Sequence, residues 1–352
     1  MTFIKQLTMN HIKPFLLICL CALTFAGCGR NTGAGQRINV IFDTDIGNDI
    51  DDAEALALLN RYIDEGRINL LGICLNKEGE KTARYVDIMN TFYGHTDIPM
   101  ARARNNGGDG EDPADRYTGK VCDLTKEDGS PLFATTGVDY ENLPDGEILY
   151  RKLLAAQPDN SVTIISVGFL TNLARLLDTP ADEYSPLTGK ELVEKKVKLL
   201  SIMAGRFIDE VPEYNVVINI PPAKKIFEEW PTRIASLPWE LGEVVRYPAA
   251  SIEKDYSWVA AHPFKEAYVR YGDMPYDNWM FDPTAVIYAV EGENLFTSSE
   301  PGTISVDDEG VTRFIPSPDG KHVHISLTPE QARALIDYSV RKLTAKPACF
   351  TE

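Results

Sequence analysis

The chain has 352 residues, a formal net charge of −17 and a hydrophobic content of 44%. That hydrophobic content is ordinary for a globular protein with a sizeable core. The negative charge argues against nucleic acid or an anionic membrane surface as a partner, because both would repel the chain. It suits a neutral small substrate and bound divalent cations.

The first 27 residues have the pattern of a secretory signal peptide. Lys5 and Lys13 precede the apolar stretch Pro14–Phe25, which ends in Ala26-Gly27-Cys28. The stretch is too short to span a membrane comfortably. Small residues directly before a cysteine resemble the bacterial lipobox, so we expect Cys28 to carry a lipid after cleavage, with residues 28–36 as a tether. This predicts a lipid-anchored protein of the bacterial cell envelope, and plain secretion is the alternative.

From residue 38 onward, apolar strand-like runs alternate with helical patterns. This alternation predicts an α/β fold with a mostly parallel sheet flanked by helices. The expected strands are 38–42, 70–75, 98–101, 162–167 and 197–204, with weaker candidates at 234–237 and 243–245. The expected helices are 52–65, 82–93, 146–156, 172–177, 222–229 and 283–289.

Other patterns occupy two internal segments and the C-terminal part of the chain. Residues 105–144 are rich in Gly, Asp and Pro and are typical of a long functional loop. Residues 254–282 have mixed character and several aromatic side chains. Near the C-terminus, the turn Asp307–Gly310 joins two β-rich runs and predicts an antiparallel hairpin over 303–315. Residues 322–327 continue that sheet, and 328–343 form an amphipathic closing helix.

Five carboxylates lie within ten residues directly after the first predicted strand, over Asp43–Asp52. Acids this close repel one another unless a cation or bound protons neutralise them. They follow the carboxyl end of a strand, where open α/β sheets place their ligands. Asp51 or Asp52 could cap the following helix, but capping needs one acid, not five. The pattern therefore favours a divalent metal site.

Two metal-binding motifs fit the acid cluster only in part. An EF-hand loop counted from Asp43 has Glu54 at its twelfth position, but it places Gly47 at position 5 instead of 6 and follows a strand, not a helix. The haloacid-dehalogenase phosphatase motif also departs at Gly47. A pocket crowded with extra carboxylates would in addition repel a phosphate unless several cations were bound.

A third comparison extends along most of the chain, because four segments resemble nucleoside hydrolases in the right order. Asp43–Ala53 resembles the family signature Asp-x-Asp-Pro-Gly-x-Asp-Asp-Ala, with two residues inserted before the last Asp pair. Ser166–Asn172 resembles Thr-Gly-x-Leu-Thr-Asn. Glu213–Asn215 matches Glu-Phe-Asn, which an apolar strand follows in the family, as at Val216–Pro221 here. Phe281-Asp282 resembles the family's His-Asp segment.

The resemblance implies a catalytic domain over residues 37–352 that hydrolyses the N-glycosidic bond of ribonucleosides with a Ca²⁺ ion. Hard oxygen donors of the implied kind suit Ca²⁺. The implied metal ligands are Asp45, Asp52, the Val167 carbonyl and Asp282, with Asp45 also the general base for a bound water. The implied ribose contacts are Asp51, Glu213, Asn215 and, on a looser alignment, Asn76. Homo-oligomers are usual in the family, and nothing in the sequence marks an interface.

The chain also departs from the family pattern. Phe281 stands where many members have His, and Phe cannot donate a proton to a departing base. Stacking against Trp258, Trp279 or a Tyr is the substitute that the sequence offers. Asp49 lies in the insertion and has no family counterpart, while Asp43 is expected to support the turn from behind. Base specificity therefore stays open, and the alternative function is a nucleoside- or ribosyl-binding envelope lipoprotein that has lost catalysis.

Three cysteines follow the predicted anchor, namely Cys74, Cys122 and Cys349. Their number is odd and their spacing fits neither a metal site nor a redox motif. The sequence allows one disulfide among them without assigning it. Cys74 falls in an apolar run, so we expect it in the core.

Overall fold

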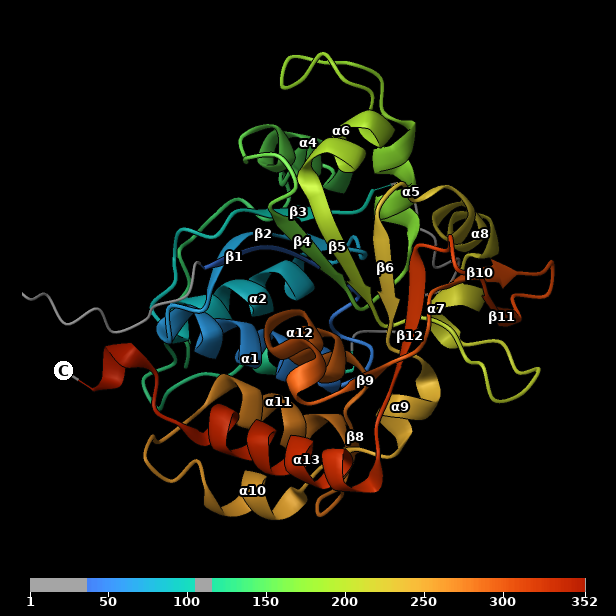
Figure 1. The fold of residues 1–352 in the computed structure, drawn as a ribbon. Coiled ribbons are helices and arrows are strands. Elements are labelled where there is room, and N and C mark those ends of the chain that lie inside the picture. Colours follow the sequence, from blue (N-terminus) through green and yellow to red (C-terminus); the bar gives the residue numbers. More distant parts are fainter. Residues whose placement is uncertain (1–36, 105–115, 352) are drawn as a thin grey trace, which may run out of the picture. The chain divides into compact units, whose positions relative to one another are not determined.

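The structure is a computed structural model, which describes residues 37–104 and 116–351 (Figure 1). The predicted signal peptide, the tether and Cys28 lie outside the described residues. Within the described ranges, no helix combines the length and the apolar character that crossing a bilayer requires.

A ten-stranded sheet forms the centre of the fold, in the order β11-β10-β12-β6-β5-β4-β1-β2-β3, with β9 paired to β12. Pairing is parallel from β3 through β1 and β4 to β6 and β12, and antiparallel where β9, β10 and β11 join. This confirms the predicted α/β fold and its C-terminal hairpin. The strands are β1 Ile38–Thr44, β2 Ile68–Leu75, β3 Met100–Arg102, β4 Val162–Ser166, β5 Val197–Ile202, β6 Arg233–Ser236, β9 Thr297–Ser298, β10 Gly302–Val306, β11 Thr312–Pro316 and β12 His322–Ser326.

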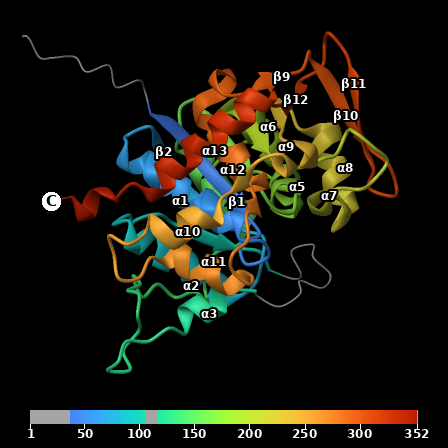
Figure 2. The same ribbon diagram turned by 90° about the horizontal axis from the view of Figure 1, so that it is seen from below.

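Helices cover both faces of this sheet (Figures 1 and 2). Side chains alternate along β1, so Val40 and Phe42 join the core on one face and Ile41 joins the core on the other. The first face packs against α1 Asp51–Asp64, α2 Glu80–Phe92, α11 Pro263–Tyr271, α12 Phe281–Glu291 and α13 Pro329–Thr344. The second packs against α4 Gly146–Ala155, α5 Thr171–Asp178, α6 Gly189–Lys196 and α8 Ile220–Glu229.

Short elements complete the described chain. The helices are α3 Thr118–Cys122, α7 Tyr214–Val217, α9 Trp239–Glu243 and α10 Ala249–Lys254, with 3-10 turns η1 Gly292–Asn294 and η2 Ala348–Phe350. β7 Arg246–Tyr247 and β8 Asn278–Trp279 form a separate two-stranded ladder.

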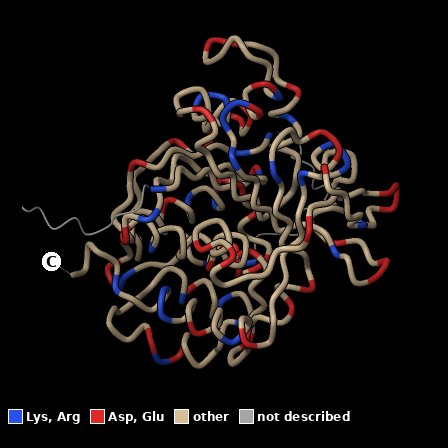
Figure 3. The backbone as a smooth tube through the Cα atoms, viewed as in Figure 1, with Lys and Arg blue, Asp and Glu red and all other residues tan. Residues whose placement is uncertain are grey.

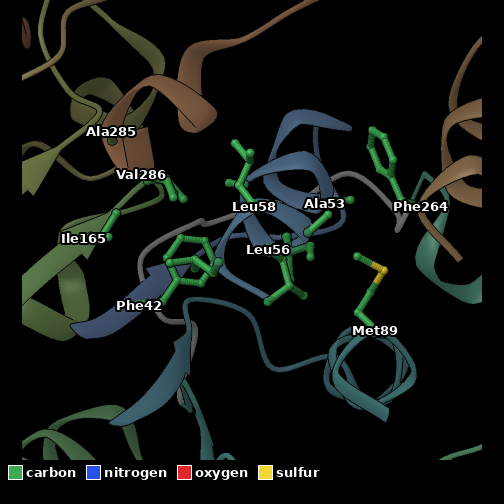
Figure 4. Packing of buried hydrophobic residues seen from close by; sticks show 14 of the residues in the cluster. Phe42, Ala53, Leu56, Leu58, Met89, Ile165, Phe264, Ala285 and Val286 are labelled. Atoms are coloured by element: carbon green, nitrogen blue, oxygen red, sulfur yellow. The ribbon is translucent and has the colours of Figure 1, made fainter. Parts of the chain in front are cut away.

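Helices α1 and α12 pack over the middle of the sheet. Figure 4 shows Leu58 of α1 and Val286 of α12 on the side of the sheet from which Phe42 and Ile165 project. All four side chains are fully buried. This packing carries the first turns of both helices to the carboxyl ends of β1 and β4.

Two predicted strands are wrong. Glu243 ends α9, and the extended residues that follow are those of β7. The strand pattern at 243–245 arose because Val245 is buried while Val244 is exposed, an alternation that a helix end also produces. Val216–Pro221 is helical, since it spans the end of α7 and the start of α8. The Glu213 side chain caps α7 by accepting hydrogen bonds from the backbone N–H groups of Asn215 and Val216.

Other elements are displaced or were missed. The third strand is β3, two residues later than expected at its start, and the predicted loop over 105–144 contains α3. The segment 254–282 contains α11. Helix α6 has a charged sequence with little periodicity, yet Thr188 and Glu191 form a capping box that could have marked its start. No disulfide joins Cys74, Cys122 and Cys349, and Cys74 is buried in the core as expected.

Candidate active site

The carboxyl ends of β1, β4 and β5 lie side by side and form the floor of a pocket. The chain continues from these strands into Asp45, Val167 and Met203, which all line it. Val167 N donates to the Asp43 carbonyl at 2.8 Å, and Met203 N donates to the Ser166 carbonyl at 2.9 Å. Sheet hydrogen bonding therefore fixes the floor, at the edge where α/β folds bind their ligands.

The pocket has a volume of about 150 Å³ and combines acids, amides and aromatic rings. Figure 3 shows acidic segments close together in the middle of the view, where Figure 1 places α12. The pocket brings together all of the predicted site residues except Asn76. Its lining residues are Asp45, Asn48, Asp49, Asp51, Asp52, Val167, Met203, Glu213, Tyr214, Asn215, Trp239, Phe281 and Asp282.

Asp51, Asp52 and Asp282 form a tight buried cluster. One carboxylate oxygen from each lies within 4.8 Å of the other two. Asp51 and Asp52 begin α1, and Asp282 lies in the first turn of α12. The N-cap of α1 is Ile50, so neither Asp51 nor Asp52 is an N-cap. The positive ends of two helix dipoles therefore point at the cluster.

The three clustered acids cannot all be ionised at little cost. Burial raises the pKa of Asp51, Asp52 and Asp282 well above the usual range, and the charges of neighbouring acids raise each further. Thr44 Oγ1 donates a hydrogen bond to Asp52, which offsets only a part of this rise. A buried set of hard oxygen donors under like-charge repulsion fits a divalent cation such as Ca²⁺.

Asp45 lies beside the cluster and is held by a chain of hydrogen bonds that the sequence did not reveal. Its charge raises the pKa of Asp52 and Asp282. Asn48 Nδ2 donates to Asp45 Oδ2 at 2.7 Å, and Lys77 Nζ donates to Asn48 Oδ1 at 2.6 Å. Asn48 and Lys77 are both buried. The lysine fixes the amide, and the amide in turn orients the Asp45 carboxylate.

Asp43 and Asn76 lie next to the pocket floor without lining the pocket, and they bind each other there. Asp43 accepts hydrogen bonds from Asn76 Nδ2 at 2.7 Å, Tyr150 OH at 3.0 Å and Asn172 Nδ2 at 3.1 Å. Burial raises the pKa of Asp43 to about 7. Asn76 thus contacts Asp43, and it is not among the lining residues. A Cβ on Gly168 would lie 2.1 Å from Asn76 Oδ1 and 2.6 Å from Asp45 N, so the close approach requires glycine there.

Glu213 and Asn215 form one wall of the pocket. Glu213 accepts backbone hydrogen bonds from Asn215 N at 2.8 Å, Gly205 N at 3.2 Å and Val216 N at 3.3 Å. Burial raises its pKa to about 7. Asn215 Nδ2 donates to the carbonyls of Val167 and Met203, both at 3.1 Å. A carbonyl oxygen has two lone pairs, so the Val167 carbonyl can still bind a cation.

Aromatic rings form another wall. Trp239 stacks on Phe281, with ring centroids 6.3 Å apart, and both line the pocket. Trp279 packs against Phe281 at 6.2 Å but is not among the lining residues. The Arg206 guanidinium lies 3.8 Å from the Trp239 ring centroid. The sequence did not single out Trp239, because no pattern predicted α9.

Trp258, one of the aromatic residues that the sequence offered in place of the family's His, packs outside the pocket. Its ring lies against Phe92, His262 and Phe350, and it is not among the residues that line the pocket. Of the aromatic substitutes that the sequence offered for the missing His, neither Trp258 nor Trp279 reaches the pocket.

Comparison with known proteins now assigns the chain to a family. Residues 40–337 match the inosine-uridine preferring nucleoside hydrolase family. The chain belongs to this family. No curated protein sequence matches this nucleoside hydrolase family member at a significant level.

Solved structures share the nucleoside hydrolase fold. A purine-preferring ribonucleoside hydrolase from Gardnerella vaginalis has a TM-score of 0.66 at 13% identity, covering 87% of this chain and 98% of its own. An inosine-uridine preferring nucleoside hydrolase from Bacillus anthracis has a TM-score of 0.64 at 16% identity, covering 87% and 99%. The type III effector protein XopQ, complexed with adenosine diphosphate ribose, has a TM-score of 0.60 at 15% identity, covering 88% and 95%. At these identities the likeness supports the fold alone.

Within this nucleoside hydrolase fold, the inserted Asp49 lies at the rim of the pocket. Its side chain is 51% exposed. Tyr271 OH donates to Asp49 Oδ1, and Arg116 Nη1 lies 3.6 Å from the same oxygen. Arg116 and Tyr117 also bind the acid loop just before the insertion, since Arg116 N donates to the Gly47 carbonyl and Gly47 N donates to Tyr117 OH, both at 3.1 Å.

Proposed function

We propose that the protein hydrolyses the N-glycosidic bond of ribonucleosides to ribose and free base, with Ca²⁺ as cofactor. The observation that carries this proposal is the buried cluster of Asp51, Asp52 and Asp282 beside Asp45. Membership of the nucleoside hydrolase family supports the reaction class. The donor set supports the cation, with Asp45, Asp52, Asp282 and the Val167 carbonyl as its ligands.

The acid-rich pocket suits the electrostatics of this reaction. Cleavage of an N-glycosidic bond builds positive charge on the ribose as it approaches an oxocarbenium-like transition state. Carboxylates stabilise that charge more than they stabilise the neutral ground state. When bound, Ca²⁺ would anchor the ribose 2′- and 3′-hydroxyls and make a water molecule more acidic.

Individual residues take distinct roles in the proposal. Asp45 accepts the proton of the attacking water at its carboxylate, and Asn48 with Lys77 keeps that carboxylate in one orientation. Asp51 binds a ribose hydroxyl. Glu213 and Asn215, which form one wall of the pocket, hold the 5′ end of the nucleoside.

A reducing-sugar assay over a panel of ribonucleosides tests this function, run with Ca²⁺ and with a Ca²⁺ chelator. We expect ribose release from at least one nucleoside, lost in the chelator and restored by added Ca²⁺. Release that is unaffected by the chelator would contradict the role of Ca²⁺. The absence of release from every nucleoside would contradict hydrolysis.

A binding protein without catalysis is the second candidate function. Phe281 in place of His favours it, because no histidine is among the residues that line the pocket of the described chain. The structurally similar XopQ is described in complex with a ribosyl compound. Calorimetry that detects ribose-dependent binding of a nucleoside, with no sugar released, would support this candidate over the enzyme.

We also propose that the mature protein is anchored to the bacterial cell envelope through a lipid on Cys28. The support is the sequence Ala26-Gly27-Cys28 after an apolar stretch. Replacement of Cys28 by Ser should move the protein from the membrane fraction to the soluble fraction. An unchanged membrane fraction would contradict the anchor.

A further inference from the structure

Asp49 has no role in the proposed mechanism, yet it lines the substrate pocket. Both of its contacts fall on one oxygen. Tyr271 OH donates to Oδ1, and Arg116 Nη1 faces Oδ1. Within residues 37–104 and 116–351, Oδ2 has no hydrogen-bond partner of its own. The carboxylate is therefore held through one oxygen while the other stays available as an acceptor at the rim.

Asp49 and Glu213 lie at different ends of the acid cluster. Tyr271 at the end of α11 donates a hydrogen bond to Asp49, whereas Glu213 is the N-cap of α7 and accepts hydrogen bonds from the backbone of Gly205 and Asn215. Helix α11, which supplies Tyr271, and helix α7, which follows Glu213, also lie apart in both ribbon views (Figures 1 and 2).

The shape of a ribonucleoside determines which part of the substrate lies at Glu213 and which part lies at Asp49. The base at C1′ and the hydroxymethyl group at C4′ project from opposite ends of the ribose ring, and the 2′- and 3′-hydroxyls lie on a third side. With the hydroxyls at the acid cluster and the 5′ end at Glu213, the base lies toward the remaining part of the pocket, where Asp49 forms the rim. This step rests on the proposed function.

We infer that Asp49 is a base-recognising residue whose carboxylate accepts a hydrogen bond from an N–H group of the nucleobase. A carboxylate has acceptor sites only, so it selects bases that present a donor, such as the exocyclic amine of adenine. Tyr271 is the positioning residue, because its hydroxyl holds Oδ1 and thereby aims Oδ2. The insertion in the acid loop thus supplies base specificity through a residue that has no counterpart in the family pattern.

Adenosine and purine riboside make a matched pair of probes, because purine riboside lacks the exocyclic amine and has no N–H on its base. Hydrogen bonds to charged groups contribute enough for a discrimination of about 10- to 100-fold. We expect Asp49→Ala to lower the ratio of kcat/KM for adenosine to kcat/KM for purine riboside by about that factor. Tyr271→Phe should lower the same ratio by less, since the carboxylate remains but is no longer held.

The matched control is Asp123→Ala. Asp123 is an exposed carboxylate paired with Lys81 at 2.7 Å, and it is not among the lining residues. Its loss should leave the ratio at the wild-type value. Thermal unfolding of all variants confirms that they fold.

The outcomes separate this inference from the proposed function. Turnover of both nucleosides with a wild-type ratio in Asp49→Ala overturns the role of Asp49 and leaves hydrolysis standing. If no nucleoside is turned over, hydrolysis fails, and calorimetry decides on Asp49 through the ratio of the two dissociation constants in the same variants. An unchanged ratio in Asp49→Ala, or no binding of either probe, then overturns the inference as well.

Discussion

The backbone N–H of Asp282 donates to Oδ2 of Asp51 at 3.2 Å, across 231 positions of sequence. This bond joins the first turns of α12 and α1 at the acid cluster. Each helix directs the positive end of its dipole there, so the fold itself neutralises a part of the negative charge. Protons or a cation must supply the remainder, which couples ligand binding to folding.

Ca²⁺ should therefore stabilise the folded protein. A cation that binds only the folded state adds about 3 kcal/mol at a hundredfold excess over its Kd. We expect Ca²⁺ to raise Tm over that of the chelator-treated protein, and Mg²⁺ to raise it less, because Mg²⁺ demands a stricter octahedral geometry. Asp282→Asn should lose most of this response while the exposed control Asp123→Asn keeps it. An equal rise in Tm on adding Ca²⁺ to both variants would rule out the cluster of Asp51, Asp52 and Asp282 as the Ca²⁺ site.

Asp45→Asn should remove most of the turnover. The amide is nearly isosteric but cannot accept the proton of the attacking water, and loss of a general base typically lowers rates by about 10²- to 10⁴-fold. Near-normal kcat in this variant would contradict the assignment of Asp45 as base. In the absence of Ca²⁺, its unfolding curve should resemble that of the wild type, which would show that the substitution leaves the fold intact.

The sequence predicted the parts of the site that carry local signals. Most strands of the sheet could be located from apolar runs that alternate with helical patterns along the chain. Such runs mark strands because a buried parallel strand is a continuous apolar segment. Asp45, Asp51 and Asp52 follow such a strand. Asp282 lies far from them along the chain, and only its resemblance to a family motif connected it to the cluster.

The missed residues depend on tertiary packing instead. Lys77 follows β2 like any polar residue after a strand, and nothing local shows that it is buried against Asn48. Trp239 lies in a five-residue helix with no periodicity to mark it. Such residues become part of the site only when distant strands and helices meet.

The hydrogen bonds from Lys77 to Asn48 and from Asn48 to Asp45 should affect kcat more than KM. Asn48→Ala removes the donor that orients the Asp45 carboxylate, and small misplacements of a catalytic group can cost up to about 10²-fold in rate. We expect a fall in kcat of about tenfold or more. Lys77→Met should act in the same direction, because it frees the Asn48 amide to rotate. The control is Lys126→Met, because Lys126 is an exposed lysine on a loop. Equal kcat values in the three variants would exclude a positioning role for Asn48 and Lys77.

The Trp239–Phe281 stack should contribute to nucleoside affinity. A nucleobase that stacks on the Trp239 ring forms an aromatic pair with it, and such pairs contribute about 0.5–1.5 kcal/mol beyond the area they bury. Trp239→Leu should therefore raise KM about 2- to 12-fold, with a smaller change in kcat. Trp258→Leu removes a tryptophan that packs away from the pocket and should leave KM at the wild-type value. Steady-state kinetics that show the same KM for both variants would contradict a binding role for Trp239.

Stability of the metal-free protein should fall as the pH rises from about 4 to 7. Burial raises the pKa of Glu213 from 4.5 to about 7, so the folded state binds a proton that the unfolded state releases. The stabilisation is complete below the unfolded pKa and is lost as the pH rises through the folded pKa.

Glu213→Gln removes this titration and should make the pH dependence shallower. Each shifted group can change the free energy of unfolding by up to about 1.4 kcal/mol per pH unit in this window. A slope remains in the variant, because burial also raises the pKa of Asp43 to about 7 and raises the pKa of the clustered acids Asp51, Asp52 and Asp282. Urea unfolding in chelator at pH 5, 6 and 7 measures the difference, with the exposed Glu127→Gln as control. Parallel slopes for Glu213→Gln and the wild type would show that the Glu213 carboxyl titrates in the folded state much as it does in the unfolded chain.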